Sequence, residues 1–525
     1  MTRLPRLPLL ARLPLLARLP LLARLPLLAR LPLVAAVSLL ALSTAALAQP
    51  TAWSRPNVST VEGPVTVEFG GVKLVNHGLV GAGRLSASLH DFHGDTLGSF
   101  SAMAITGWRR LADGTYTGRL TTLPDRGPNG VGTIVGTSDY ANRLHRFDFT
   151  FAPHAGTAVA APDQVVLTPA GGQLLKDAKG QTFTGLDPSE PKAAGRTSLD
   201  SEGLAMTADG GFYVSDEYAA AIYRFDKAGA LKGVIAPVAA VAPMNAGAPM
   251  LTGAKAPETG RRNNQGIEGV SITPNGKRLA ALLQSATVQD AASAKDTDHT
   301  RANTRLFLYD ISKSATPAAP VAEYVVQLPV FRNKGDGAAP DKTAAQSEIL
   351  ALSDRQFLVL ARDGNGRGGG ATRPAVYRSV LLIDTTGATN IAGTPYETSA
   401  KPIAPNGVLE AGIVPVKQVE LVNLINPTQL ARLGLNLDNA ATNGFTLSEK
   451  FEALALVPAL DPKAPNDAFL FIGSDNDFQT SQGVVGGATF DAGIKAADGS
   501  PAGDNDNLIL VYRLTLPGWS APAAR

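Results

Sequence analysis

The chain has 525 residues, of which 44% are hydrophobic and 18% charged, with 53 Gly, 37 Pro and no Cys. This composition excludes a disordered chain, a collagen-like fibre and a disulfide-stapled scaffold, and the length suffices for a large core. The formal net charge is only +2, so nothing in the charge balance indicates a nucleic-acid partner or an anionic membrane surface.

The first 48 residues have the pattern of a cleaved export signal. A hexamer, Arg-Leu-Pro-Leu-Leu-Ala, repeats from Arg6, an apolar run follows from Leu33, and Ala46-Leu47-Ala48 is a small-x-small cleavage motif. The apolar run of about 16 residues is shorter than the ~20 that cross a bilayer. We therefore expect cleavage after Ala48, no membrane span in the mature protein, and a periplasmic or secreted location in a bacterium.

Beyond residue 48, short alternating apolar runs separated by Gly, Pro, Asn and Asp predict an all-β chain. One unit recurs along it. The unit begins with a strand that usually opens on Glu, turns at Asp-Gly or Asn-Gly, and closes with a second strand that ends in polar residues. Five copies are detectable, at 99–127, 200–217, 266–285, 346–364 and 450–477.

The clearest units continue with two more strands. These predicted strands are 221–226 and 231–236 in one unit, and 304–310 and 322–328 in the next. Four antiparallel strands in each repeated unit are typical of a β-propeller, so we predict a propeller of five to seven blades. The segment 66–78 has no hairpin partner nearby and is expected to complete the last blade, closing the ring.

This organisation predicts four parts of the chain: a signal peptide (1–48), an N-terminal segment (49–98), a propeller domain (99–515) and a C-terminal tail (516–525). Four insertions rich in Ala, Pro and Gly are expected to be surface loops. They cover 237–262, 286–303, 331–345 and 386–416.

The repeat also predicts where acidic side chains gather. In each hairpin, the Glu that opens the first strand and the polar residues that end the second lie at one edge of the sheet. With the first strand innermost, radial repetition brings these acids around one axis. Many oxygen ligands, no Cys and almost no His suit a hard cation, Ca²⁺ before Mg²⁺. The predicted metal ligands are Glu202, Glu268, Glu348, Glu452, Asp125 and Asp475.

Catalytic roles are predicted for four further residues of the same edge. A spare carboxylate would accept a proton from a water molecule, and an arginine would hold an anionic group. These residues are Asp216, Glu217, Arg126 and Arg362. The alternative is that such acids only cap turns and lock blades together. The cluster His90–Asp95 is interpreted as a polar loop rather than a metal site.

Several segments together resemble the exported phytase-like proteins, the family named for the esterase-like activity of phytase. The matching segments are LPDRGPNG (123–130), DSEGLA (200–205), YVSDEYAAAIYRFD (213–226), NNQGIEGVSITPNGKRLAALLQS (263–285), FLVLARDGNGRG (357–368), KFEALALV (450–457) and FIGSDNDF (471–478), within a resemblance that covers roughly 99–515. The resemblance implies hydrolysis of a phosphoester or another ester. The chain departs from the family's usual Glu-Gly at Glu348-Ile349 and Glu452-Ala453.

Motifs of other hydrolases are absent from the sequence. There is no Gly-x-Ser-x-Gly elbow, no His-Glu-x-x-His and no Cys, which disfavours serine, zinc-peptidase and thiol chemistry. We therefore expect an exported, metal-dependent esterase or phosphoesterase that acts on a small molecule. Two alternatives stay open: a lactone hydrolase of the gluconolactonase type, and a non-catalytic propeller that binds a glycan, a peptide or an envelope partner and holds a structural metal.

Overall fold

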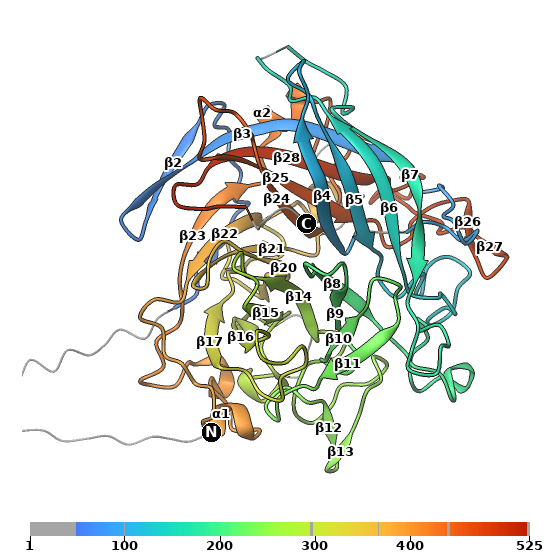
Figure 1. The fold of residues 1–525 in the computed structure, drawn as a ribbon, viewed down its shortest axis with the longest axis vertical. Helices are drawn as coiled ribbons and strands as arrows, with labels where there is room; N and C mark the ends of the chain where they lie inside the picture. The colour runs from blue at the N-terminus through green and yellow to red at the C-terminus, as the bar shows by residue number, and fades with distance from the viewer. Residues whose placement is uncertain are drawn as a thin grey trace, which may run out of the picture. The chain divides into compact units, whose positions relative to one another are not determined.

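Five antiparallel sheets, built largely from strands that follow one another along the chain, make up most of the fold (Figure 1). The computed structural model describes residues 49–98, 100–156, 158–293, 298–365, 367–437 and 442–521. All of these belong to a single unit. The predicted signal peptide lies outside the described residues, and the four-part division of the chain stays a prediction.

Four of the sheets are four-stranded meanders. The first sheet contains β4 (Ala102–Arg110), β5 (Tyr116–Leu123), β6 (Arg143–Phe151) and β7 (Val165–Leu174), and the second contains β8 (Ser201–Met206), β9 (Phe212–Asp216), β10 (Ile222–Phe225) and β11 (Leu231–Ile235). The third contains β14 (Ile267–Ile272), β15 (Arg278–Leu283), β16 (Asn303–Asp310) and β17 (Ala322–Gln327). The fourth contains β20 (Ala345–Ala351), β21 (Gln356–Arg362), β22 (Arg378–Asp384) and β23 (Lys417–Asn423). Each of the first four predicted repeat units therefore corresponds to one of these sheets.

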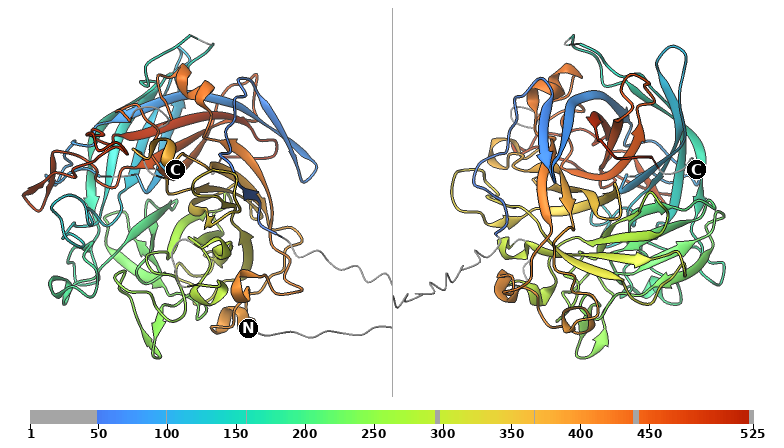
Figure 2. Two further views of the ribbon diagram at one scale, coloured as in Figure 1. Left: turned by 180° about the vertical axis from the view of Figure 1, so that it is seen from behind. Right: turned by 60° about the vertical axis from the view of Figure 1, so that its left-hand side comes forward.

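The fifth sheet joins both ends of the described chain. Its order is β2 (Val65–Phe69), β3 (Val72–Leu85), β28 (Asn507–Thr515), β25 (Asp467–Asp475) and β24 (Lys450–Pro458). In Figure 2 the blue β3 runs beside the dark red β28, as their pairing requires. The segment 66–78 thus joins the last sheet as expected, but it was wrong to give it no partner nearby. Gly70 and Gly71, both with positive φ, make the tight turn that pairs Phe69 with Val72.

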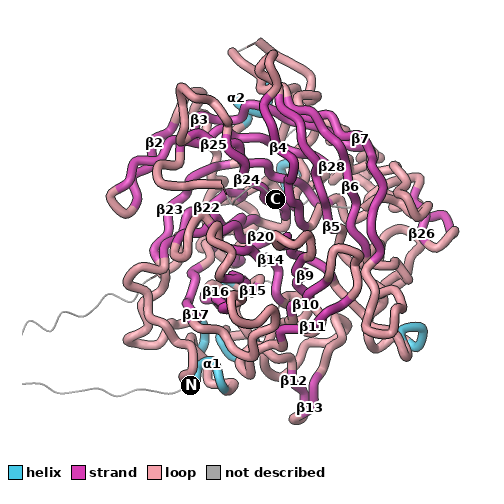
Figure 3. The backbone as a smooth tube through the Cα atoms, in the orientation of Figure 1, coloured by secondary structure: helices cyan, strands magenta, loops and turns pink. Residues whose placement is uncertain are grey.

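The remaining regular elements are short, and the described residues contain little helix (Figure 3). The short strands are β1 (Ala52–Trp53), β12 (Met244–Asn245), β13 (Ala248–Pro249), β18 (Val330–Phe331), β19 (Lys342–Thr343), β26 (Gly483–Val485) and β27 (Ala488–Phe490). The helices are α1 (Pro395–Thr398), α2 (Pro427–Arg432) and single 3-10 turns at Pro191–Ala193, Val288–Asp290, His299–Arg301, Gly370–Thr372 and Pro405–Gly407. The all-β prediction is confirmed.

The first strands of the five repeat units, one from each sheet, contact one another in a cycle. Strand β4 contacts β8, β8 contacts β14, β14 contacts β20, β20 contacts β24, and β24 contacts β4. The last strands of the meanders lie farther out in Figure 1. Each sheet keeps its own hydrogen-bonded ladder. The five first strands therefore neighbour one another, so residues near their beginnings can meet although they belong to different sheets.

The insertions between strands are not simply loops on the surface. Ile391, Ile403 and Leu409, all from the 386–416 insertion, are buried and pack with Val325 of β17. Burial of these apolar side chains holds the insertion against the sheet.

A charged network lies beneath the same insertion. Arg305 of β16 lies 3.0 Å from Asp290 and 2.7 Å from Glu323, and all three side chains are fully buried. Arg305 also donates a hydrogen bond to the carbonyl of Tyr396, and Asp290 accepts one from the amide of Ile403. The buried guanidinium group of Arg305 thus connects residues of two insertions with residues of two strands.

Candidate functional site

Three of the predicted glutamates occupy β-bulges near the beginning of a first strand. In β14, Ile267 pairs with Leu283 and Gly269 pairs with the adjacent Leu282, so Glu268 is the extra residue. Strand β24 has the same irregularity, with Glu452 as the extra residue, and in β8 the bulge contains Glu202 and Gly203. A bulge leaves one residue out of the ladder and redirects its side chain, and such irregularities are common beside active sites.

Glu348 does not belong to this set. In β20, Gln346 pairs with Ala361 and Glu348 pairs with Leu360, so the extra residue is Ser347. Because side chains alternate along a strand, a shift of one residue sends the side chain to the other side. The placement of Glu348 with the other glutamates was therefore wrong, and Ser347 takes that place in the fourth sheet.

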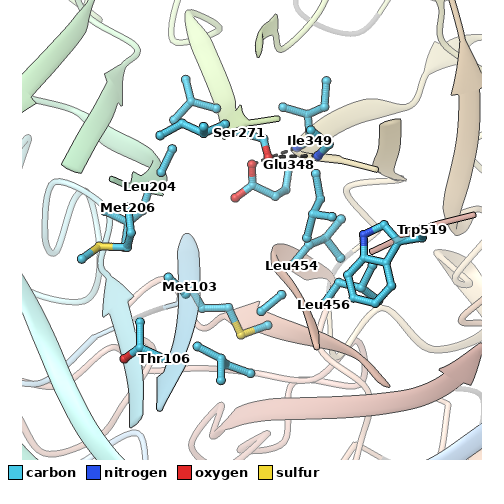
Figure 4. A pocket seen from close by; sticks show the side chains of 18 residues that line it. Met103, Thr106, Leu204, Met206, Ser271, Glu348, Ile349, Leu454, Leu456 and Trp519 are labelled. Carbon is cyan, nitrogen blue, oxygen red and sulfur yellow. Dashed lines mark hydrogen bonds between the residues drawn. The ribbon is translucent and has the colours of Figure 1, made fainter. Parts of the chain in front are cut away.

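Glu348 lines a different cavity, formed mainly by apolar side chains of the five first strands (Figure 4). Met103, Leu204, Leu454 and Trp519 are among its walls. The Glu348 carboxylate accepts a hydrogen bond of 2.8 Å from the amide of Ile349. Burial raises the pKa of Glu348 well above its ordinary value. These contacts leave it on the apolar side of the cycle of strands.

Seven of the ten predicted site residues line one cavity of about 400 Å³, which we call the carboxylate cavity. They are Asp125, Arg126, Glu202, Glu217, Glu268, Arg362 and Glu452. Lys450, Asp477, Asn264 and Gln284 also line it. The cavity thus combines many carboxylates with three cationic side chains, and it is large enough for a small molecule.

Asp216 and Asp475 are close to the cavity but do not line it. Asp216 accepts hydrogen bonds from the amides of Asp200, Tyr218 and Ala219, at 3.0, 3.1 and 2.7 Å. These contacts fasten the turn after β9, which is a structural role. Asp475 instead accepts hydrogen bonds from the amide of Asp477 at 2.6 Å and from Lys450 at 3.0 Å.

Three cationic side chains neutralise part of the carboxylate cavity. Arg126 pairs with Asp200, Arg362 pairs with Glu452, and Lys450 pairs with both Asp475 and Asp477. Sequence reasoning did not select Asp200 or Lys450. Both were within the repeat: Asp200 begins the segment DSEGLA, and Lys450 begins KFEALALV. Their charge alone was the signal that could have found them.

Glu202, Glu217 and Glu268, which we call the glutamate group, have no such partner. One carboxylate oxygen from each lies within 4.8 Å of the other two, and all three residues are buried. Among the described residues none of the three takes part in an ion pair. Glu217 Oε1 and Glu268 Oε2 also lack a hydrogen-bond partner. Unpartnered buried carboxylate oxygens are costly, and oxygen ligands in this number and at this spacing fit a hard divalent cation.

The pKa values of the carboxyl groups in and beside the cavity reflect this excess of negative charge. Burial raises the pKa of Glu217 to about 7 and that of Asp200 to about 7, against opposing attraction from Arg126. Burial also raises the pKa of Glu202 and Glu268 well above its ordinary value, and neighbouring carboxylates raise it further. Each proton or cation that enters the cavity therefore relieves repulsion.

Chelator-treated protein should lose stability as the pH rises from about 4 to about 7. A folded-state pKa raised to about 7, as for Glu217 and Asp200, means that the folded state holds protons which the unfolded chain releases near its ordinary pKa of about 4. The stabilisation by these bound protons is complete below about pH 4 and is lost as the pH rises through about 7. Melting temperatures at pH 5 and pH 8 in the presence of chelator measure it. A higher melting temperature at pH 8 would contradict this assignment.

Three residues of the cavity wall also have unusual backbone geometry. Asn264, Asp477 and Phe478 have φ values of 49°, 50° and 54°, although none is Gly. The side-chain oxygen of Asn264 accepts a hydrogen bond from Arg126. Left-handed backbone at non-glycine residues costs free energy and concentrates at functional sites, so this geometry is a further reason to place function here.

The His-bearing segment lies elsewhere and is held by a different network. Asp91 lies 2.7 Å from Arg143 and 3.0 Å from the ring of His145, and Asp95 lies 2.8 Å from Arg143. With both acids engaged by one buried arginine, the segment has the geometry of a fastened loop.

Comparison with known proteins places the chain among related sequences. A curated relative, an uncharacterised secreted protein of Arthroderma benhamiae, is 34% identical over 461 residues, which cover 78% of this chain and 88% of the relative. That relative is fungal, so the expected bacterial source is not supported. Among the described residues, no helix has the length and apolar character needed to cross a membrane.

Two solved structures show a distant likeness to this chain. A luciferin-regenerating enzyme is 10% identical with a TM-score of 0.28, over 84% of this chain and 98% of that one. A protein of unknown function from Dyadobacter fermentans is 12% identical with a TM-score of 0.27, over 87% and 100% of the two chains.

The family comparison covers most of the site. The model of the phytase-like family, described as the esterase-like activity of phytase, matches residues 97–478. This range contains every residue that lines the carboxylate cavity except Gln479. The chain belongs to the phytase-like family.

Proposed function

We propose that this protein is a secreted hydrolase of phosphoesters or other esters that uses a divalent cation, Ca²⁺ before Mg²⁺, in the carboxylate cavity. The observation that carries the proposal is the glutamate group: three buried carboxylates that lie close together, take part in no ion pair among the described residues, and line a cavity large enough for a small molecule. Family membership supports ester hydrolysis. The secreted relative and the N-terminal pattern of residues 1–48 support secretion.

Glu202 and Glu268 are proposed to hold the cation and Glu217 to accept a proton. The bulges of β8 and β14 fix the first two side chains beside each other. Glu217 Oε1 has no hydrogen-bond partner, and in the cavity without a cation burial raises its pKa to about 7. A cation beside it would lower that pKa, so that Glu217 is ionised at neutral pH and can accept a proton. A bound cation would supply Lewis-acid polarisation of the ester and a more acidic water molecule.

The arginines are proposed to bind the anionic part of the substrate. The Nε atom of Arg126 is buried and has no hydrogen-bond partner, although its guanidinium group also pairs with Asp200. Arg362 is held at the cavity wall by Ser347, at 2.9 Å, and by Glu452. Fixed guanidinium groups of this kind bind phosphate or carboxylate oxygens and stabilise charge that develops during hydrolysis.

The cycle of first strands supports a five-bladed propeller as the framework of this site. In that arrangement each blade contributes the beginning of its first strand to the axis, which explains why residues as far apart in the chain as Glu202 and Glu452 line one cavity.

Hydrolysis of p-nitrophenyl phosphate and p-nitrophenyl acetate by the mature protein tests the proposed activity. We expect turnover of at least one ester, its loss after chelation, and its recovery on addition of Ca²⁺. Metal binding without hydrolysis of either ester would contradict the enzymatic proposal and favour a binding protein. Turnover that chelation leaves unchanged would contradict the role of the cation.

A further inference from the structure

Lys450 lies among the acids of the carboxylate cavity at a point where a second cation would fit. Its Nζ atom is 3.0 Å from Asp475 Oδ2 and 2.7 Å from Asp477 Oδ1. It is also 3.6 Å from Glu452 Oε1. An ammonium group so placed neutralises several carboxylates at once.

The acids around Lys450 have the spacing of metal ligands. One oxygen each from Asp125, Asp475 and Asp477, which we call the aspartate group, lies within 4.8 Å of the other two. Ca²⁺ binds carboxylate oxygens at about 2.3–2.6 Å, only slightly shorter than the distances that Lys450 makes to Asp475 and Asp477. The ammonium group and a bound cation would therefore compete for the same oxygens.

The fold fixes Lys450 in this position. Lys450 begins β24 and pairs directly with Asp475 at the end of β25, so their side chains are neighbours across the ladder. The amide of Asp477 donates to Asp475 and keeps the second aspartate beside the first. Nearby carboxylates hold the pKa of Lys450 well above its ordinary value against the effect of burial. The side chain is thus a permanent positive charge.

The glutamate group provides the contrast. It has the same 4.8 Å spacing, but the ion pairs of Arg126, Arg362 and Lys450 all go to other acids. Glu217 Oε1 and Glu268 Oε2 remain without partners. A third group with this spacing, Asp125, Asp200 and Glu202, shares members with both, and its Asp200 pairs with Arg126. Among the described residues, the chain thus supplies a cation to each of these groups except the glutamate group.

We propose that Lys450 is a built-in cation that closes a latent second metal site at the aspartate group, so that the protein takes up one exchangeable divalent cation, at the glutamate group. The cation expected at the glutamate group rests on the proposed function. The closure of the aspartate group does not, because it depends only on the contacts of Lys450. It predicts a mononuclear centre next to a fixed ammonium group rather than a dinuclear one.

Calcium stoichiometry in the purified mature protein tests the proposal. We expect one bound Ca²⁺ per chain in the parent and two in Lys450→Met, measured by calorimetric titration of chelator-treated protein and by elemental analysis. Lys450→Arg keeps the positive charge and should bind one. Lys463→Met, which removes an exposed lysine, is the matched control and should also bind one. Should Lys450→Met fail to fold, Lys450→Gln keeps a hydrogen-bond donor and tests the same vacancy.

The outcomes separate the two proposals. One Ca²⁺ in both the parent and Lys450→Met would overturn the role of Lys450 and leave the glutamate site standing, as would two in the parent. None in the parent but one in Lys450→Met would overturn the glutamate site and support the built-in cation. None in either protein would overturn both.

Discussion

Replacing Glu202 and Glu268 together by Gln is expected to lower kcat/KM for ester hydrolysis at least about 100-fold while the protein still folds. Gln keeps the size and much of the hydrogen bonding of Glu but removes its charge. The two residues supply carboxylates to the glutamate group, so their loss removes both the ligands and the field that would activate water, and losses of about 10²–10⁴ are usual for such groups. Calorimetric Ca²⁺ titration should show weakened binding in parallel.

Glu68→Gln is the control variant for replacing a charged Glu by a neutral Gln. Glu68 is exposed on the outer strand β2, far from the carboxylate cavity in the sheet order, and its variant should match the parent in hydrolysis and Ca²⁺ binding. The double variant should also be more stable than chelator-treated parent at pH 8, because two repelling carboxylates are gone. Unchanged turnover in the double variant would refute the assignment of the site.

Arg305→Leu is expected to lower the free energy of unfolding by about 3–5 kcal/mol. The substitution leaves Asp290 and Glu323 without their partner, and all three side chains are fully buried. Removing one member of a buried ion pair strands the other charge in a medium that solvates it poorly. Urea unfolding at pH 7.5, followed by circular dichroism, measures the loss.

Two further variants locate the cause of that loss. Arg119→Leu breaks a pair with Asp148 whose side chains are 52% and 61% exposed, and it should cost less than about 1 kcal/mol. Adding Asp290→Asn and Glu323→Gln to Arg305→Leu removes the stranded charges and should restore part of the stability. A triple variant no more stable than Arg305→Leu would show that the loss comes from packing rather than charge.

Much of the architecture could be predicted because its causes are local. Alternating apolar residues and Gly or Asn turns specify each hairpin, and the predicted strands at 221–226 and 322–328 coincide with β10 and β17. The gathering of acids at one edge followed from the same repeat, since both ends of a hairpin lie together. The hairpin of β2 and β3 was missed although Gly70-Gly71 is a strong turn signal.

The details of the site could not be predicted for two physical reasons. The position of a bulge depends on how two strands pair, so the sequence likeness of Glu348 to Glu268 concealed a shift of one residue that makes Ser347 the bulged residue, in contact with Arg362. The choice of partners in an ion pair depends on contacts between sheets. Arg362 pairs with Glu452, 90 residues away, and no repeat within the chain specifies that contact.

The pairing of β3 with β28 bears on when the protein can finish folding. Asn507 pairs with Leu85, so the earliest long strand waits for the last one to be synthesised. The four meanders can each form from neighbouring strands, but the fifth sheet needs both ends of the chain, and contacts of such long sequence separation form slowly. The fifth sheet therefore stays incomplete until the residues of β28 have been synthesised, and until then β3 and β25 each keep an edge that can pair with another chain.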